Sequence, residues 1–308
     1  MSLVRASVPT ALDGERVDRA VALLGGLSRS EVADLVRAGR VRLSGLTVSA
    51  RSRRVETGDT LEVDLPEPGR SEGPAPDPAV EVPVVWADDE VVVVDKPPGV
   101  VVHPGAGNRA GTLVQGLVAR FPDLAAAGAG ERDRPGIVQR LDKGTSGLLV
   151  VARTAAAHRS LVAQLAARSV ERRYLALVLG LVEADSGVVE APVGRSGRDP
   201  TRMAVSRQGR PARTTYRVER RYHRPSATLV DCRLETGRTH QVRVHMAAIG
   251  HPVAGDGRYG PAGPAVGLER PFLHAHRLSF DHPGTGERLS FSSPLPADLE
   301  AVLSRLSS

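Results

Sequence analysis

Apolar residues recur every three or four positions over two stretches near the start of the chain, residues 17–24 and 32–36, and glycines follow both stretches. This spacing predicts two amphipathic helices. Short apolar runs separated by Ser-Gly and Gly-Asp pairs predict strands at 41–43, 47–48 and 61–63. We therefore expect a small domain of two helices and short strands over residues 15–65.

The pattern changes after residue 65. Six prolines over residues 66–83 favour an extended, semi-rigid linker. Apolar, β-branched runs then mix with helical spacing: strands are predicted at 90–95, 148–152, 170–180, 188–191, 212–220 and 227–234, and helices at 112–121, 155–167, 240–249 and 296–306. Because regular strand–helix–strand alternation is missing, we expect residues 84–308 to be an α+β domain, built on one large mixed, mainly antiparallel sheet with flanking helices.

The composition excludes several classes of protein. Of the 308 residues, 41% are hydrophobic and 25% are charged, as in ordinary globular proteins. Cys232 is the only cysteine, which rules out an intramolecular disulfide framework and a multi-cysteine zinc cluster. No apolar run reaches the roughly 18 residues that span a membrane, and Pro9 and Asp13 interrupt any signal-peptide core. We expect the protein to work in the cytoplasm.

The placement of arginine says more than the net charge of +6, because a general arginine bias also follows from GC-rich codons. Residues 28–54 hold seven arginines against two acidic residues, and residues 193–221 hold nine against two. Such clusters are typical of surfaces that bind polyanions, although a solvated basic surface has the same pattern.

The segment GIVQRLDKGTSG, residues 136–147, places Asp142 between Arg140 and Lys143 in a turn before an apolar strand. Flanking cations favour the ionised carboxylate, which suits a nucleophile or a base. We expect the hydroxyls of Thr145 and Ser146 to bond the backbone and hold this loop. A salt-bridged surface aspartate is an equally good interpretation of the residues alone. An aspartyl-phosphate loop fits poorly, since the apolar strand follows the aspartate instead of preceding it.

A second candidate lies in GRTHQVRVHMAAIGHPVAGDGRYG, residues 237–260. On a helix that begins near Thr239, Arg243 shares a face with Thr239 and His240 and could clamp a carboxylate with two hydrogen bonds. A solvated arginine on a helix face is the plainer alternative. The histidine spacings do not bring metal ligands together on a helix, so we expect no metal.

The string RVDRAVALLGGLSRSEVADLVRAGRVRLSGLTVSARSRRVETGDTLEV resembles the small RNA-binding domain named after ribosomal small-subunit protein S-four. Several separated elements agree, over roughly residues 15–65. The resemblance implies phosphate contacts, which position RNA and make its affinity depend on salt. The residues implied are Arg29, Arg37, Arg40, Arg51, Arg53 and Arg54.

Five further strings occur in one order: DKPPGVVVHPG, RLDKGTSGLLVVA, YLALVLG, the segment 237–260 and LHAHRLSFDHP. Together they resemble the pseudouridine synthases, and within them the branch that modifies large-subunit ribosomal RNA. The resemblance implies an isomerase that converts uridine to pseudouridine without a cofactor, with RNA as its partner. We expect a monomer, with residues 193–221 as an RNA-facing arm beside the cleft.

The resemblance also implies roles for single residues. Asp142 matches the catalytic aspartate that attacks the target nucleoside, and Tyr174 matches the tyrosine that packs on the base and handles a proton. Arg243 matches the arginine that pairs with the aspartate. Arg140 matches a residue that faces the RNA, and Leu273 an apolar residue that lines the pocket.

The chain departs from the family pattern at two positions. Gln139 stands where His is usual, and Gly144 where Asp is common. We still expect activity, with Gln139 supplying an equivalent hydrogen bond. The alternative is a non-catalytic RNA-binding factor for ribosome assembly that retains the fold.

Overall fold

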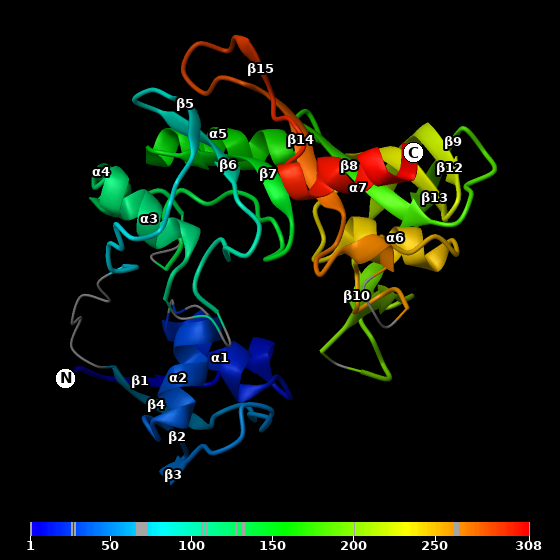
Figure 1. Ribbon diagram of the computed structural model, residues 1–308. Helices are drawn as coiled ribbons and strands as arrows, with labels where there is room; N and C mark the ends of the chain where they lie inside the picture. The colour runs from blue at the N-terminus through cyan, green and yellow to red at the C-terminus, as the bar shows by residue number, and fades with distance from the viewer. Residues whose placement is uncertain are drawn as a thin grey trace. The chain divides into compact units, whose positions relative to one another are not determined.

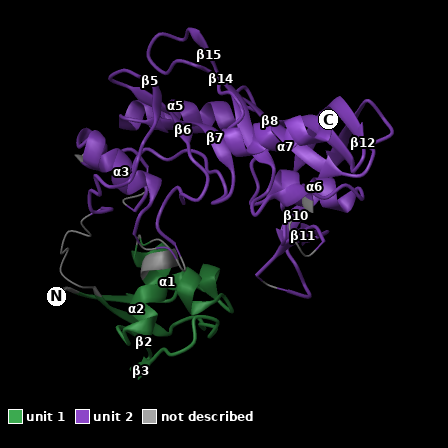
Figure 2. Cartoon of the chain, in the orientation of Figure 1, with its two compact units in different colours: residues 1–71 green, residues 72–308 purple. Residues whose placement is uncertain are grey.

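The computed structural model describes residues 2–25, 27, 29–65, 73–105, 108, 110–126, 128–130, 133–199, 201–261 and 265–307. The chain divides into two compact units, residues 1–71 and 72–308 (Figure 2).

The first unit combines two helices with a four-stranded antiparallel sheet (Figure 1). Its elements are β1 (Ser2–Ser7), η1 (Thr10–Leu12), α1 (Val17–Gly25), α2 (Arg29–Arg37), β2 (Val41–Leu43), β3 (Leu46–Thr47) and β4 (Thr60–Leu65). The apolar faces predicted for α1 and α2 are buried against residues of β2 and β4. The hydrophobic pattern did not reveal β1, which pairs with β4 along its whole length, so the unit starts well before residue 15.

The second unit is built on a sheet of nine strands. In sequence order they are β5 (Val84–Ala87), β6 (Val91–Lys96), β7 (Ser146–Ala152), β8 (Glu171–Leu179), β9 (Ser186–Glu190), β12 (Arg213–His223), β13 (Ser226–Leu234), β14 (Leu273–Asp281) and β15 (Arg288–Ser292). The spatial order is β5-β6-β7-β14-β8-β13-β12-β9, and β15 pairs with β14. Only β7 and β14 pair in parallel among these described strands, so the predicted mixed, mainly antiparallel sheet is confirmed.

Apolar residues cover both faces of this sheet, which explains the continuous apolar runs in the sequence. On β6, Val92 and Val94 face one core, and Val91 and Val93 face another. Residues of α3 (Leu113–Arg120), α6 (Gln241–Ala248) and α7 (Ala297–Ser307) join the first core, and α5 (Ala155–Ala166) joins the second. The helices α4 (Asp123–Ala126) and η2 (Ala265–Gly267) are short.

A separate hairpin of β10 (Val193–Arg195) and β11 (Met203–Val205) projects beyond α6 (Figure 1). It packs on α6 through Val193, Met203 and Val244. The basic segment 193–221 is therefore divided, because its second half is strand β12 of the large sheet.

The part of the predicted linker that the structure describes, residues 73–83, belongs to the second unit. Val82 is buried in the first core, and the Asp77 amide donates to the carbonyl of Gln115 on α3 at 3.1 Å. The prolines keep this segment extended, but Val82 still packs into the first core.

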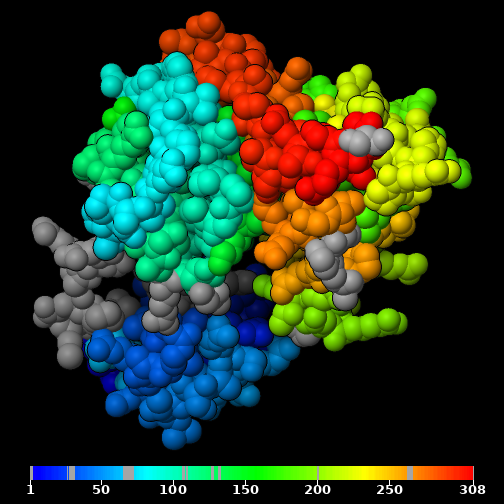
Figure 3. All heavy atoms as spheres, viewed as in Figure 1, coloured from blue at the N-terminus to red at the C-terminus, as the bar shows by residue number. Residues whose placement is uncertain are grey.

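Helix α7 lies at the surface of the second unit, next to the segment that precedes β14 (Figure 3). Arg270 binds Asp298 of α7 through two hydrogen bonds of 2.6 and 2.8 Å, and its Nη1 atom donates to the carbonyl of Gly144 at 3.1 Å. Arg270 thus ties α7 to the loop that carries Asp142.

Candidate functional site

Asp142 lies in the loop that enters β7, and backbone contacts hold this loop. The Thr145 amide donates to the Asp142 carbonyl at 3.0 Å, and the Gly99 amide donates to the Lys143 carbonyl at 2.7 Å. The expected hydroxyl contacts are wrong: Ser146 Oγ lies 3.0 Å from His274 Nδ1, and Thr145 Oγ1 is buried without a hydrogen-bond partner among the described residues. The turn therefore depends on its own backbone and on long-range donors.

Gly147 lets the loop join the sheet. Its φ angle is 114°, and a Cβ atom there would lie 2.4 Å from the carbonyl oxygen of Ala275 on β14. Any other residue would push apart the parallel pair β7–β14. The Gly in the motif thus serves close strand packing just beyond Asp142.

Arg243 lies on α6, as predicted, and contacts two carboxylates. Its Nη1 atom donates to Asp142 Oδ2 at 3.1 Å, while Nε and Nη2 bind Asp256 at 2.6 and 2.8 Å. The bidentate clamp therefore holds Asp256, and Asp142 receives one hydrogen bond. Burial disfavours the charged form of Arg243, but the two carboxylates outweigh it, so the pKa of Arg243 lies above its ordinary value.

Sequence reasoning missed Asp256, although it belongs to a quoted motif. Its side chain is only 1% exposed. The preceding Gly255 has a φ of 74°, and a Cβ atom there would lie 2.1 Å from the Arg270 carbonyl oxygen. The Gly-Asp pair inside the quoted motif was the only signal in the sequence. The structure adds the reason for the pair: the glycine allows close packing, and the deeply buried carboxylate needs a cation as partner.

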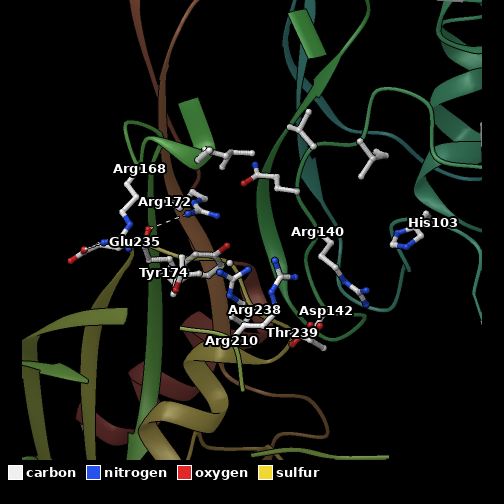
Figure 4. A pocket seen from close by; sticks show the side chains of 18 of the residues that line it. His103, Arg140, Asp142, Arg168, Arg172, Tyr174, Arg210, Glu235, Arg238 and Thr239 are labelled. Carbon is white, nitrogen blue, oxygen red and sulfur yellow. Dashed lines mark hydrogen bonds and ion pairs between the residues drawn. The ribbon is translucent and has the colours of Figure 1, made fainter. Parts of the chain in front are cut away.

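A cavity of about 700 Å³ opens beside Asp142 (Figure 4). Its walls include Asp142, Tyr174 of β8, Gln139 and His103. Six arginines and two carboxylates line it, which makes the cavity strongly positive. They are Arg134, Arg140, Arg168, Arg172, Arg210, Arg238, Asp142 and Glu235.

Tyr174 forms part of the cavity wall while most of its surface is buried. Burial raises the pKa of Tyr174 to about 12. The charge of Arg172 acts in the opposite direction, and Asp142 adds to the rise. The phenol therefore keeps its proton at neutral pH, and its ring offers an apolar surface in a cationic cavity.

Arg172 is an unusual wall residue, because the residue is only 7% exposed and the structure records no carboxylate partner for it among the described residues. Its Nη2 atom donates to the Leu234 carbonyl at 3.4 Å, and a Cβ atom on Gly237 would lie 2.8 Å from Nη1. Burial, with the nearby Arg238, lowers the pKa of Arg172. A buried, unpaired cation on a cavity wall is suited to an anionic ligand.

Lys96, in the Lys-Pro-Pro-Gly turn, is fully buried behind the Asp142 loop. Its Nζ atom donates to the carbonyls of Pro97 at 2.8 Å and Val100 at 2.9 Å, and it lies 3.5 Å from that of Lys143. Burial lowers the pKa of Lys96 to about 7, and the charge of Asp142 opposes this shift. The Lys96 ammonium thus anchors the Asp142 loop from inside the protein.

A further pair, His240 and Tyr259, borders Asp142 and was not predicted. His240 Nε2 lies 3.8 Å from Asp142 Oδ1, and His240 Nδ1 lies 2.7 Å from the Tyr259 hydroxyl. Among the described residues no group of three or more His, Cys, Asp or Glu side chains could hold a metal ion.

The other predicted site residues have no recorded contact with the Asp142 side chain. Arg140 is exposed on the cavity wall, whereas Leu273 is buried in the core and does not line the cavity. Gln139 lines the cavity, but the structure records no hydrogen bond of its side chain to another described residue. Its expected hydrogen bond therefore remains a prediction.

In the first unit, Arg37 and Arg51 line a shallow hollow of about 440 Å³ together with Arg16. Arg53 is exposed, and Arg54 donates to the Gly14 carbonyl. Arg40 is half-buried, and the side chain of Arg29 lies outside the described residues. No described helix is long and apolar enough to cross a membrane.

Comparison with known proteins gives the same two units. Residues 90–248 match the sequence model of RNA pseudouridylate synthase, and residues 15–61 match that of the S4 domain. The chain is 44% identical over 293 residues to the uncharacterized RNA pseudouridine synthase YlyB of Bacillus subtilis, covering 95% of this chain and 94% of the relative. It is 42% identical over 314 residues to the ribosomal large subunit pseudouridine synthase D of Pseudomonas aeruginosa, covering 98% and 95%.

Two solved structures of proteins with the same family name are similar to this chain. The human RNA pseudouridylate synthase domain containing 1 matches with a TM-score of 0.56 and 30% identity, over 72% of this chain and 88% of that chain. The human RNA pseudouridylate synthase domain containing 4 matches with a TM-score of 0.55 and 26% identity, over 73% and 93%.

Proposed function

Because the chain belongs to the RNA pseudouridylate synthase family, we propose that it converts specific uridines of large-subunit ribosomal RNA to pseudouridine, with Asp142 as nucleophile. The observation that supports this most directly is the constellation at the cavity: Asp142 held by Arg243, and Tyr174 on the same wall. The relatives named for the large ribosomal subunit support the substrate.

The reaction is an isomerisation, so its atoms and electrons balance without a cofactor. The bond from the ribose C1′ to uracil N1 breaks, and a bond from C1′ to uracil C5 forms. The C5 proton is lost and N1 gains one. Asp142 attacks the nucleoside and lets the base detach and turn, while Arg243 keeps the carboxylate aimed at the cavity.

A base inside a helix cannot present its glycosidic bond, so the uridine must leave the stack at a cost of a few kcal/mol. The Tyr174 ring would pack on the extruded base, and the cavity arginines would bind the phosphates beside it. Arg172 is best placed for this, since its buried charge lacks a carboxylate partner among the described residues.

The first unit would supply affinity through its basic hollow, with Arg37 and Arg51 on its wall. Four further arginines would extend these phosphate contacts: Arg29, Arg40, Arg53 and Arg54. Arg140 would face the RNA near the position that the extruded uridine leaves. Phosphate contacts position RNA without reading its sequence, so the choice of uridine depends on the second unit and on RNA shape. We expect the protein to act in the cytoplasm as a monomer.

The competing function is an RNA-binding assembly factor that keeps the fold without catalysis. Gln139 at the usual His position favours it, whereas the intact contact between Arg243 and Asp142 speaks against it. The test is pseudouridine formation on fragments of large-subunit ribosomal RNA by the wild type and Asp142→Asn. We expect product from the wild type alone, with RNA binding retained by the variant. Product from both proteins would exclude Asp142 as nucleophile, and product from neither would favour the assembly factor.

A further inference from the structure

We infer that Tyr259 is a positioning residue: its hydroxyl fixes the proton of His240 on Nε2, the ring nitrogen that faces Asp142. The inference rests on the proposed function for its consequence in catalysis, but its structural part can be tested without RNA.

The argument begins with the two polar neighbours of the Tyr259 oxygen. The Met203 amide donates to it at 3.1 Å, and His240 Nδ1 lies 2.7 Å away. A phenol has one proton to donate, and the structure records no other hydrogen-bond partner for this hydroxyl among the described residues. With one lone pair of the oxygen taken by the Met203 N–H, we assign the Tyr259 proton to the short contact with His240 Nδ1, which then acts as the acceptor.

The proton of a neutral imidazole must then lie on the other nitrogen. Burial lowers the pKa of His240; Asp142 opposes this, while Arg243 and Arg258 add to it. The ring is therefore neutral at pH 7 and carries its hydrogen on Nε2, 3.8 Å from Asp142 Oδ1. This distance is too long for a hydrogen bond. In this tautomer, however, the positive end of the N–H dipole faces the carboxylate. The opposite tautomer would turn a lone pair toward it.

The backbone of His240 supports a functional placement. At the start of α6 its φ and ψ angles are 58° and 22°, a left-handed conformation that costs free energy for a residue other than glycine. This conformation brings the ring between Asp142 and Tyr259, where both contacts form.

Tyr259 also connects the β10–β11 hairpin to His240 and Arg243. Met203 lies on β11, and the guanidinium of Arg202 packs over the Tyr259 ring with 5.3 Å to the centroid. Arg243 packs over the same ring, with 5.0 Å to the centroid. Tyr259→Phe keeps the ring and these contacts and removes only the hydroxyl, so it isolates the effect on His240.

The first experiment reads the tautomer directly by long-range ¹H–¹⁵N NMR of the free, full-length protein at pH 7. The signals of His240 are identified by their loss in His240→Gln. We expect Nε2–H in the wild type and a mixture of both tautomers in Tyr259→Phe. A wild-type ring protonated on Nδ1, or an unchanged tautomer in Tyr259→Phe, would overturn the inference whatever the protein does to RNA.

The second experiment measures pseudouridine formation as a double-mutant cycle. Tyr259→Phe should lower kcat about 5- to 10-fold, the effect of one hydrogen bond, with KM and RNA affinity unchanged. Gln at position 240 presents an amide N–H and has no tautomers, so Tyr259→Phe should have no further effect in the His240→Gln background. The same loss in both backgrounds would show that Tyr259 acts only through the hairpin, contrary to the inference.

A matched control removes a hydroxyl elsewhere. Tyr216→Phe on β12 lies outside the cavity and should leave kcat unchanged. A wild type that forms no pseudouridine would refute the proposed function, while the NMR result would still decide the tautomer.

Discussion

Nη1 of Arg243 donates to Oδ2 of Asp142 across 3.1 Å, joining residues that are 101 positions apart in the chain. Asp256 already occupies Nε and Nη2 of the same guanidinium. The position of Asp142 thus depends on a third residue, Asp256, which does not contact Asp142 directly and whose carboxylate also accepts hydrogen bonds from the Arg258 and Tyr259 amides.

Asp256→Asn should therefore damage both stability and turnover. The change leaves a buried guanidinium short of one carboxylate, which costs about 3–5 kcal/mol when a buried pair is broken. We expect a lower free energy of unfolding in urea and a kcat reduced about 100-fold, because Arg243 loses its fixed orientation. Asp298→Asn is the matched control: it breaks the same bidentate geometry with Arg270, but Asp298 is 46% exposed, so the loss should be about 1 kcal/mol or less. Equal losses in the two variants would contradict the importance of burial.

Arg172→Met should strengthen the fold and weaken RNA binding. Removing a buried charge that has no carboxylate partner among the described residues should raise the free energy of unfolding by about 1 kcal/mol. If Arg172 binds a phosphate, RNA affinity should fall and the slope of log K against log salt should decrease by about one. Arg159→Met, at an exposed position on α5, is the control for loss of charge. An unchanged salt slope in Arg172→Met would exclude the phosphate contact.

Lys96→Met should reveal a pH-dependent stability difference. The folded-state pKa of Lys96 is lowered to about 7 from 10.5, so between these values the unfolded chain binds a proton that the folded one does not. Stability of the wild type therefore rises with pH in this window, by about 1.4 kcal/mol per unit at most, and this contribution is absent below pH 7. The measurement is the difference in unfolding free energy between wild type and Lys96→Met at pH 6, 7, 8 and 9. We expect the wild type to gain relative to the variant above pH 7; a constant difference would mean that Lys96 keeps its proton in the fold.

Charge reversal in the hairpin region should affect binding more than catalysis. Arg198 and Arg207 are exposed, and the structure records no ion pair for either among the described residues. Arg198→Glu combined with Arg207→Glu should lower RNA affinity and its salt slope, with little effect on turnover at saturating RNA. Arg159→Glu serves as the control. Unchanged affinity would exclude this region from the RNA interface.

Much of the architecture could be predicted from the sequence because it depends on local periodicity. The helical spacing at 17–24 and 112–121 and the β-branched run at 90–95 correspond to α1, α3 and β6 of the structure. Strands such as β1 and β15 escaped prediction because they lie at sheet edges, where pairing with a distant strand compensates for a weak apolar pattern.

The candidate site, too, was predicted only in part from the sequence. Local chemistry marked Asp142 and Arg243 as candidates, and the resemblance to a family added Tyr174 and implied that the three residues meet. It could not reveal that Asp256 holds Arg243 or that Tyr259 reaches His240, because these contacts form only when loops from distant positions converge. Nor could the arginine count show that Arg172 is buried without a carboxylate partner among the described residues, that Arg243 is buried in an ion pair, or that Arg140 is exposed. Burial and pairing decide what a charge can do, and both are properties of the folded chain.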